Sequence, residues 1–150
     1  MTAAPSPARV DFYVLETSDD RARLLYVCRL VEKAFQQNQT VYVHAGSIAE
    51  ADQLDELLWT FADKSFVPHL PAAASGEAPV RIGCGDPIAA QVLVQLGTEA
   101  PEFAPTYERV AEFVDAEPGR RDQGRKRFAW YRDRGLKPET HKVGADGTRG

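Results

Sequence analysis

The sequence predicts an α/β fold with a parallel sheet, because strand and helix patterns alternate twice near its N-terminus. Residues 10–15 (VDFYVL) and 40–45 (TVYVHA) are short runs of apolar and β-branched residues, which favours buried strands. Each run is followed by apolar residues at the spacing of one helix face: Leu24, Val27, Cys28, Val31 and Phe35 after the first, and Leu54, Leu57, Leu58 and Phe61 after the second. Such an alternation within about 50 residues is typical of a parallel sheet covered by helices.

Both predicted helices carry signals at their ends. Thr17, Ser18 and Asp19 are all suitable N-caps for the first helix, which we expect to end near residues 37–38. Ser47, followed three residues later by Glu50, predicts a capping box in which each side chain satisfies a backbone N–H at the start of the second helix.

The second half of the chain is less regular. Residues 80–84 and 92–96 predict two further strands, and the apolar segment 65–70 is interrupted by Pro68. Residues 108–114 (ERVAEFV) fit a strand or the start of a helix, and their alternation favours a strand.

A long amphipathic helix is predicted from Pro118, which suits a helix N-terminus, to about Arg134. Gly135 is a natural C-cap. We expect a single domain over residues 1–142 and a flexible C-terminal tail over residues 143–150. Neither a membrane-spanning run nor a signal peptide is predicted, and the isolated Cys28 and Cys84 fit reduced thiols in a cytoplasmic protein.

Charge is unevenly distributed along the chain. Residues 120–142 contain nine Lys/Arg and three acids, about +6, whereas the rest of the chain contains nine basic and nineteen acidic residues, about −10. A basic C-terminal segment on an acidic body indicates an anionic partner.

Motifs for catalysis or cofactor binding are weak in this sequence. The turn after the first strand, residues 16–20 (ETSDD), has no glycine and three acids, which disfavours a bound nucleotide phosphate. His44, His69 and His141 are scattered and lack metal-ligand spacing. We therefore expect no cofactor, no metal site and no catalytic residue.

A stripe of arginines around an aromatic ring is the feature that favours a binding function. Arg121, Arg125, Phe128 and Arg132 fall at i, i+4, i+7 and i+11 of the predicted C-terminal helix, on one face. Arginine binds carboxylates through paired hydrogen bonds, and a ring can floor an apolar pocket, so a peptide with both characters would fit. The alternative is a solvated basic face with Phe128 and Tyr131 turned into the core.

Several segments resemble the chi subunit of bacterial DNA polymerase III, in the same order along the chain. They are Asp11-Phe12-Tyr13-Val14-Leu15, Leu54-Asp55-Glu56-Leu57-Leu58-Trp59, Ser65-Phe66-Val67-Pro68-His69, Ala78-Pro79-Val80 and Arg125-x-Arg127-Phe128-x-x-Tyr131-Arg132-x-x-Gly135. The resemblance implies a three-layer Rossmann-like, mostly parallel sheet flanked by helices, without a nucleotide-binding glycine loop. It also implies a non-catalytic adaptor that links the clamp loader to single-stranded DNA-binding protein and contacts DNA only indirectly.

The resemblance further implies where the acidic, Pro-Phe-ended tail of single-stranded DNA-binding protein would bind. Arg125 would hold the carboxylates of the tail, with Arg121 adding charge. Phe128, Val114 and Trp59 would wall its apolar pocket. The family often has another basic residue where this chain has Ala129. The tail would then bind less tightly, or Arg132 and Lys126 would substitute for the missing charge.

A second partner surface is implied by the segment 65–69. Phe66, Pro68 and His69 would face the psi subunit, the family's usual link to the clamp loader, and the alternative is a turn that only fills the core. For the whole chain the alternatives are a small-molecule or nucleotide-binding α/β enzyme, or a protein that binds single-stranded nucleic acid directly. An enzyme would show a deep pocket at the carboxyl ends of the strands, whereas the adaptor would show a shallow apolar notch beside Arg125.

Overall fold

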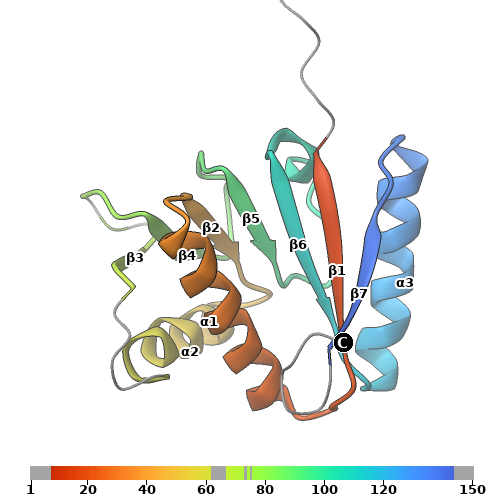
Figure 1. Cartoon of the computed structure of the whole chain (residues 1–150), viewed down its shortest axis with the longest axis horizontal. Helices are drawn as coiled ribbons and strands as arrows, with labels where there is room; N and C mark the ends of the chain where they lie inside the picture. Colours follow the sequence, from red (N-terminus) through yellow and green to blue (C-terminus); the bar gives the residue numbers. More distant parts are fainter. Residues whose placement is uncertain (1–7, 62–66, 73, 75, 144–150) are drawn as a thin grey trace, which may run out of the picture.

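Seven strands form one all-parallel sheet within the part of the chain that the computed structural model describes, residues 8–61, 67–72, 74 and 76–143 (Figure 1). The strands are β1 (Arg9–Leu15), β2 (Val41–His44), β3 (His69–Pro71), β4 (Val80–Gly83), β5 (Val92–Gln95), β6 (Arg109–Val114) and β7 (Glu139–Val143), in the order β3-β4-β2-β5-β6-β1-β7. Every neighbouring pair in this order runs parallel.

Three α-helices and one short 3₁₀ helix complete these elements: α1 (Asp20–Gln36), α2 (Ile48–Thr60), α3 (Pro118–Asp133) and η1 (Ala104–Thr106). The predicted caps are found. Asp19 accepts a hydrogen bond from the Arg21 amide at the start of α1, and Ser47 Oγ accepts one from the Glu50 amide, 3.1 Å away. After α3, Gly135 has φ +81°, the left-handed conformation expected of a C-cap glycine.

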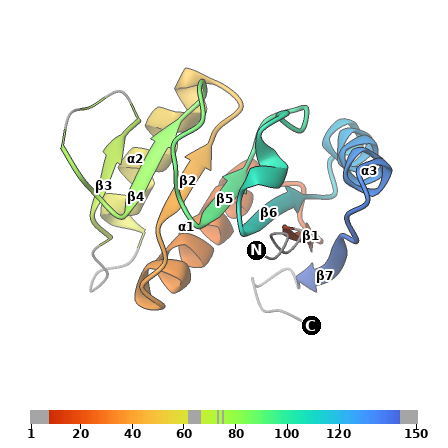
Figure 2. The same cartoon turned by 90° about the horizontal axis from the view of Figure 1, so that it is seen from above.

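Two apolar cores, one on each face of the sheet, define three layers. Residues of α1 and α2 pack with alternate side chains of the strands on one face, and residues of α3 and η1 pack on the other. Figure 2, which looks along the strands, shows α3 beside β6 and β1, far from β3 at the other edge of the sheet. The prediction of a three-layer α/β fold with a mostly parallel sheet is confirmed.

Two strands were not predicted. β3 (His69–Pro71) follows Pro68 and pairs with β4 for three residues only. β7 (Glu139–Val143) has a polar sequence, ETHKV, with one buried apolar residue, and it becomes a strand by pairing with β1. Val143 ends this strand and is fully buried, so this residue does not belong to a flexible tail. Residues 144–150 lie outside the described part of the chain.

None of the helices in the described residues is both long enough and apolar enough to span a membrane.

Candidate functional site

Helix α3 lies unusually close to the sheet because of a glycine. An ideal Cβ placed on Gly124 would lie 2.5 Å from Val114 Cγ2, so any side chain here would push α3 away from β6. Val114 itself is 7% exposed and belongs to the same core as the partly buried Phe128. The close approach therefore brings together Val114 and Phe128, two of the residues expected in one pocket.

A buried polar cluster anchors the inner face of α3. Arg127 Nε donates to Glu112 Oε1 at 2.8 Å, and Tyr131 Oη donates to Glu112 Oε2 at 2.8 Å. Arg127 also donates to the carbonyls of Thr98 and Phe113, at 3.0 and 3.3 Å. Burial raises the pKa of the Glu112 carboxyl, and the Arg127 guanidinium is the largest opposing influence. These hydrogen bonds fix the rotation of α3 about its axis.

The outer face of α3 carries the predicted stripe. Arg121, Arg125 and Arg132 are exposed and form no ion pair with any described residue, unlike their neighbours on the helix. Arg120 is held by Asp115 at 2.7 Å. The arginines at i, i+4 and i+11 are therefore left with their positive charge unbalanced.

Phe128 lies between the two predicted arrangements. Its ring packs on Phe12 with centroids 5.2 Å apart, and its outer part remains accessible. Tyr131 is fully buried, as the alternative arrangement proposed. The outer face of α3 thus presents, around a half-buried aromatic ring, three guanidinium groups that pair with no residue of the described ranges. None of the four described cavities is lined by Arg125 or Phe128, so the predicted notch beside Arg125 is not found among them.

Trp59 does not lie with these residues, which corrects its place in the predicted pocket. It stands on α2, whose side chains pack on the opposite face of the sheet, against β3 and β4. Its ring lies on that of His69, with centroids 4.3 Å apart, and it is 50% exposed. α2 and α3 are thus separated by the sheet, and one short peptide tip cannot touch both.

The segment predicted to face a second partner contacts Trp59 through His69. His69 is buried, with Nδ1 2.6 Å from the Val67 carbonyl and Nε2 3.0 Å from the Asp55 carbonyl. Pro68 is half-buried, and Phe66 lies outside the described residues. The buried ring of His69 therefore packs against the ring of Trp59, and Trp59 is the exposed residue of this pair.

Apart from the burial of Tyr131 in one of the predicted arrangements, the contacts that position α3 were not predicted from the sequence. Gly124, Arg127 and Tyr131 stand at i, i+3 and i+7, a second stripe on the inner face of the helix. Glu112 occupies the matching inward position of the strand predicted at 108–114. The spacing of Arg127 and Tyr131 on one helix face can be recognised in the sequence. Their pairing with Glu112 across the layers cannot.

A polar cavity of about 340 Å³ lies at the carboxyl ends of the strands, where an enzyme of this fold class would have its active site. Its arginines are already paired, Arg120 with Asp115 and Arg127 with Glu112. Arg23 binds Asp20 at 2.8 Å and Glu50 at 2.6 Å. The ion pair of Arg23 with Glu50 connects α1 to the start of α2, so its role is structural.

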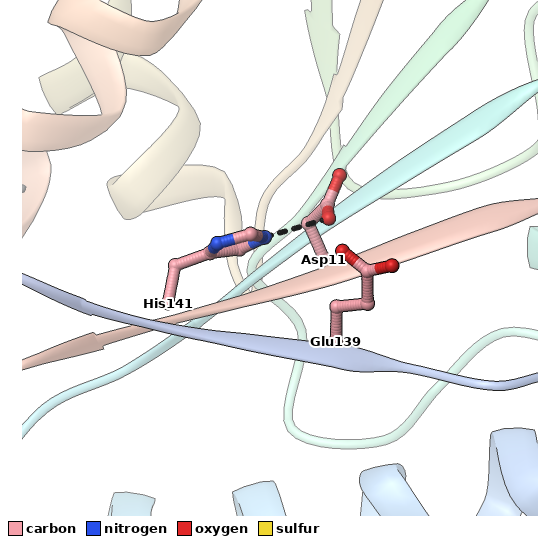
Figure 3. Close-up of side chains that lie close together, drawn as sticks. All are labelled: Asp11, Glu139 and His141. Atoms are coloured by element: carbon pink, nitrogen blue, oxygen red, sulfur yellow. Dashed lines mark hydrogen bonds and ion pairs between the residues drawn. The ribbon is translucent and has the colours of Figure 1, made fainter.

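Asp11, Glu139 and His141 form the one group of three possible metal ligands in the described residues (Figure 3). Figure 3 shows His141 directed at Asp11, and His141 Nε2 lies 2.8 Å from Asp11 Oδ1. Arg9 and Arg109 also bind this carboxylate, at 3.0 and 3.1 Å. Burial raises the pKa of Asp11, but the His141 hydrogen bond and both arginines outweigh it, so the pKa lies below its ordinary value. With two guanidinium groups in place, the cluster joins β6, β1 and β7 and disfavours a metal cation.

Comparison with known proteins identifies the family. Residues 8–139 match the family model described as DNA polymerase III chi subunit, HolC. The chain is 42% identical to the DNA polymerase III subunit chi of Pseudomonas aeruginosa, over 90% of this chain and 96% of that protein. The proteins of the same name from Haemophilus influenzae and Escherichia coli are 28% and 29% identical, over 89% and 76% of this chain and 96% and 81% of their own lengths. The chain therefore belongs to the DNA polymerase III chi subunit family.

Proposed function

We propose that this protein is a non-catalytic adaptor of the replication machinery, in which the outer face of α3 binds the acidic C-terminal tail of single-stranded DNA-binding protein. The observation that carries the proposal is the set Arg121, Arg125 and Arg132, which are exposed around the half-buried ring of Phe128 and form no ion pair within the described part of the chain. The tail carries both carboxylates and an apolar tip, so it matches both parts of this surface. The place of action is the cytoplasm, with the replisome.

The position of α3 suits this task. Arg127, Glu112 and Tyr131 lock the inner face, so the arginines of the outer face project from a rigid helix. A rigid surface loses less conformational entropy when a peptide binds. Arg125 stands one residue after Gly124, where α3 is closest to the sheet, and one turn before Phe128. It is therefore the arginine best placed to bind a carboxylate while the apolar tip lies on the ring.

We expect Arg125→Ala to weaken binding of an acidic peptide ending in Pro-Phe about tenfold or more, because a charge-assisted hydrogen bond is lost. Fluorescence anisotropy of the labelled peptide measures this. Lys137→Ala is the matched control, since Lys137 is an exposed cation just beyond the C-terminal end of the same helix.

A labelled oligonucleotide in the same assay separates the adaptor from a direct nucleic-acid binder. The adaptor predicts peptide binding that depends on Arg125 and a much weaker response to the oligonucleotide. Unchanged peptide affinity in Arg125→Ala would contradict the proposal, as would an oligonucleotide that binds through the same arginine more tightly than the peptide.

The second contact of the adaptor, toward the psi subunit or another clamp-loader component, is proposed on the surface around Trp59. A tryptophan that is half exposed and held rigid by His69 is typical of a binding hot spot. Pro68, half-buried beside His69, extends this surface. Because α2 and α3 lie on opposite faces of the sheet, both partners could bind at the same time.

We expect Trp59→Ala to weaken binding of the clamp-loader partner by about 2 kcal/mol or more, since a buried hot-spot ring would be lost. Isothermal titration calorimetry with the purified partner measures the effect, and Thr60→Ala, its exposed neighbour, is the control. Tail-peptide affinity should remain unchanged in both variants. A loss of peptide binding in Trp59→Ala would instead show that Trp59 contributes to the tail site.

A further inference from the structure

A recess lined by cations lies on the α1 side of the sheet, at the amino ends of β1 and β6. Arg9 and Arg109 are register partners on these two strands, and Arg29 and Lys33 stand one turn apart on α1. The recess has a volume of about 410 Å³, within the range of sites that hold small ligands. It is separated by the sheet from the outer face of α3.

The charges of this recess are not balanced. Among the described residues that line it, none is acidic. Asp11, buried between the strands, is the acid that binds Arg9 and Arg109, and it serves both at once. Arg29 and Lys33 form no ion pair with any residue of the described ranges. Arg9 and Arg109 thus share one carboxylate and the two cations of α1 have none among the described residues, which favours binding of an anion.

A polar group without a partner lines the same recess. The side-chain Oε1 of Gln39 is buried and accepts no hydrogen bond within the described part of the chain. The half-buried ring of Tyr26 lies along the same wall and offers an apolar surface. The recess therefore combines positive charge, the polar side chain of Gln39 and an aromatic ring.

We propose that this recess binds a nucleotide through its phosphate. Arg9, Arg29, Lys33 and Arg109 supply the counter-charge, and a phosphate suits several cations at once because it has several acceptor oxygens. The side chain of Gln39, on the wall of the recess, adds a polar group beside these cations. A free nucleotide and one nucleotide unit of single-stranded DNA share this chemistry. The site is independent of tail binding by α3.

The test uses the full chain with two probes, deoxyadenosine monophosphate followed by NMR and a short labelled oligothymidylate followed by anisotropy. Arg29→Ala/Lys33→Ala removes the two cations of α1, both exposed, so the fold is retained. Arg21→Ala is the matched control, because Arg21 is exposed on the same helix outside the recess. Tail-peptide binding, measured in parallel, should be the same in all three proteins.

We expect the double variant to lose about tenfold or more in affinity, and the control to keep wild-type affinity. Saturable mononucleotide binding that exceeds oligonucleotide binding identifies a free nucleotide as the ligand. Tighter oligonucleotide binding, with a salt slope that falls by about 1.4 in the double variant, identifies single-stranded DNA. Equal affinities in wild type and double variant, or no saturable binding of either probe by wild type, would overturn the proposal.

Discussion

Replacing Arg127 by methionine should lower the free energy of unfolding by about 3–5 kcal/mol, because it leaves the fully buried Glu112 carboxylate without its counter-charge. Methionine fills similar space, so the lost charge rather than a cavity dominates the effect. Thermal or urea unfolding measures the change. Lys126→Met is the matched control, since Lys126 is the exposed neighbour, and it should change stability by less than about 0.5 kcal/mol.

A second substitution separates the charge from the packing. In the Arg127→Met background, Glu112→Gln removes the unpaired charge and keeps an oxygen for the Tyr131 hydroxyl. This double variant should recover most of the lost stability. Full loss in the double variant would show that Arg127 acts through packing rather than through its charge.

The pH dependence of Arg127→Met follows from the pKa of Glu112. Burial raises this pKa, and the variant lacks the guanidinium that opposes the shift. A folded-state pKa above the unfolded-state value makes stability greatest at pH values below the unfolded-state pKa, and stability falls as the pH rises through the folded-state pKa. The deficit of the variant relative to wild type should therefore be smaller at about pH 5 than at about pH 8.

Gly124→Leu should cost about 3 kcal/mol of stability and should also weaken tail-peptide binding, because α3 must move away from β6. Helix propensity alone predicts the opposite sign, since leucine is favoured over glycine by somewhat less than about 1 kcal/mol. Chemical unfolding therefore distinguishes the two effects directly. Ala129→Leu, at an exposed position of the same helix, is the control and should be nearly neutral.

The contact responsible can be tested by compensation. Gly124→Ala places a methyl group against Val114, and Val114→Ala removes both of the Cγ atoms that it would meet. The two substitutions together should cost less than the sum of their separate effects, since each relieves the other. Strict additivity would show that the close approach of α3 does not depend on this pair.

Local patterns account for the parts of the fold that were predicted correctly. The first two strand–helix units follow from apolar periodicity and from caps such as Ser47, signals that lie within a few residues of one another. β6 was identified by its alternation, which places Val110 and Glu112 on one face and Ala111 on the other. β7 has no such pattern. Its strand conformation comes from the hydrogen bonds of β1, 128 residues earlier at the Asp11–Glu139 pair.

The candidate site was likewise predicted in part from local spacing and in part decided by tertiary packing. The spacing of Arg121, Arg125 and Phe128 placed them on one helix face, and the structure confirms that both arginines are exposed there. The position of Trp59 required knowledge of which face of the sheet each helix covers. Helix periodicity defines an inner and an outer side of each helix, but it does not say on which face of the sheet the helix lies.

The sequence by itself determined the fold class, the helix that carries the arginines and, through its resemblance, the protein family. Only the tertiary structure decided that Trp59 and Phe128 belong to separate surfaces, that Arg127 is buried against Glu112, and that four cations from three elements converge on one recess. The physical reason is the sequence separation over which each kind of interaction acts. Periodicity and capping are interactions between residues a few positions apart, whereas charge pairing and surface sharing depend on how distant segments pack.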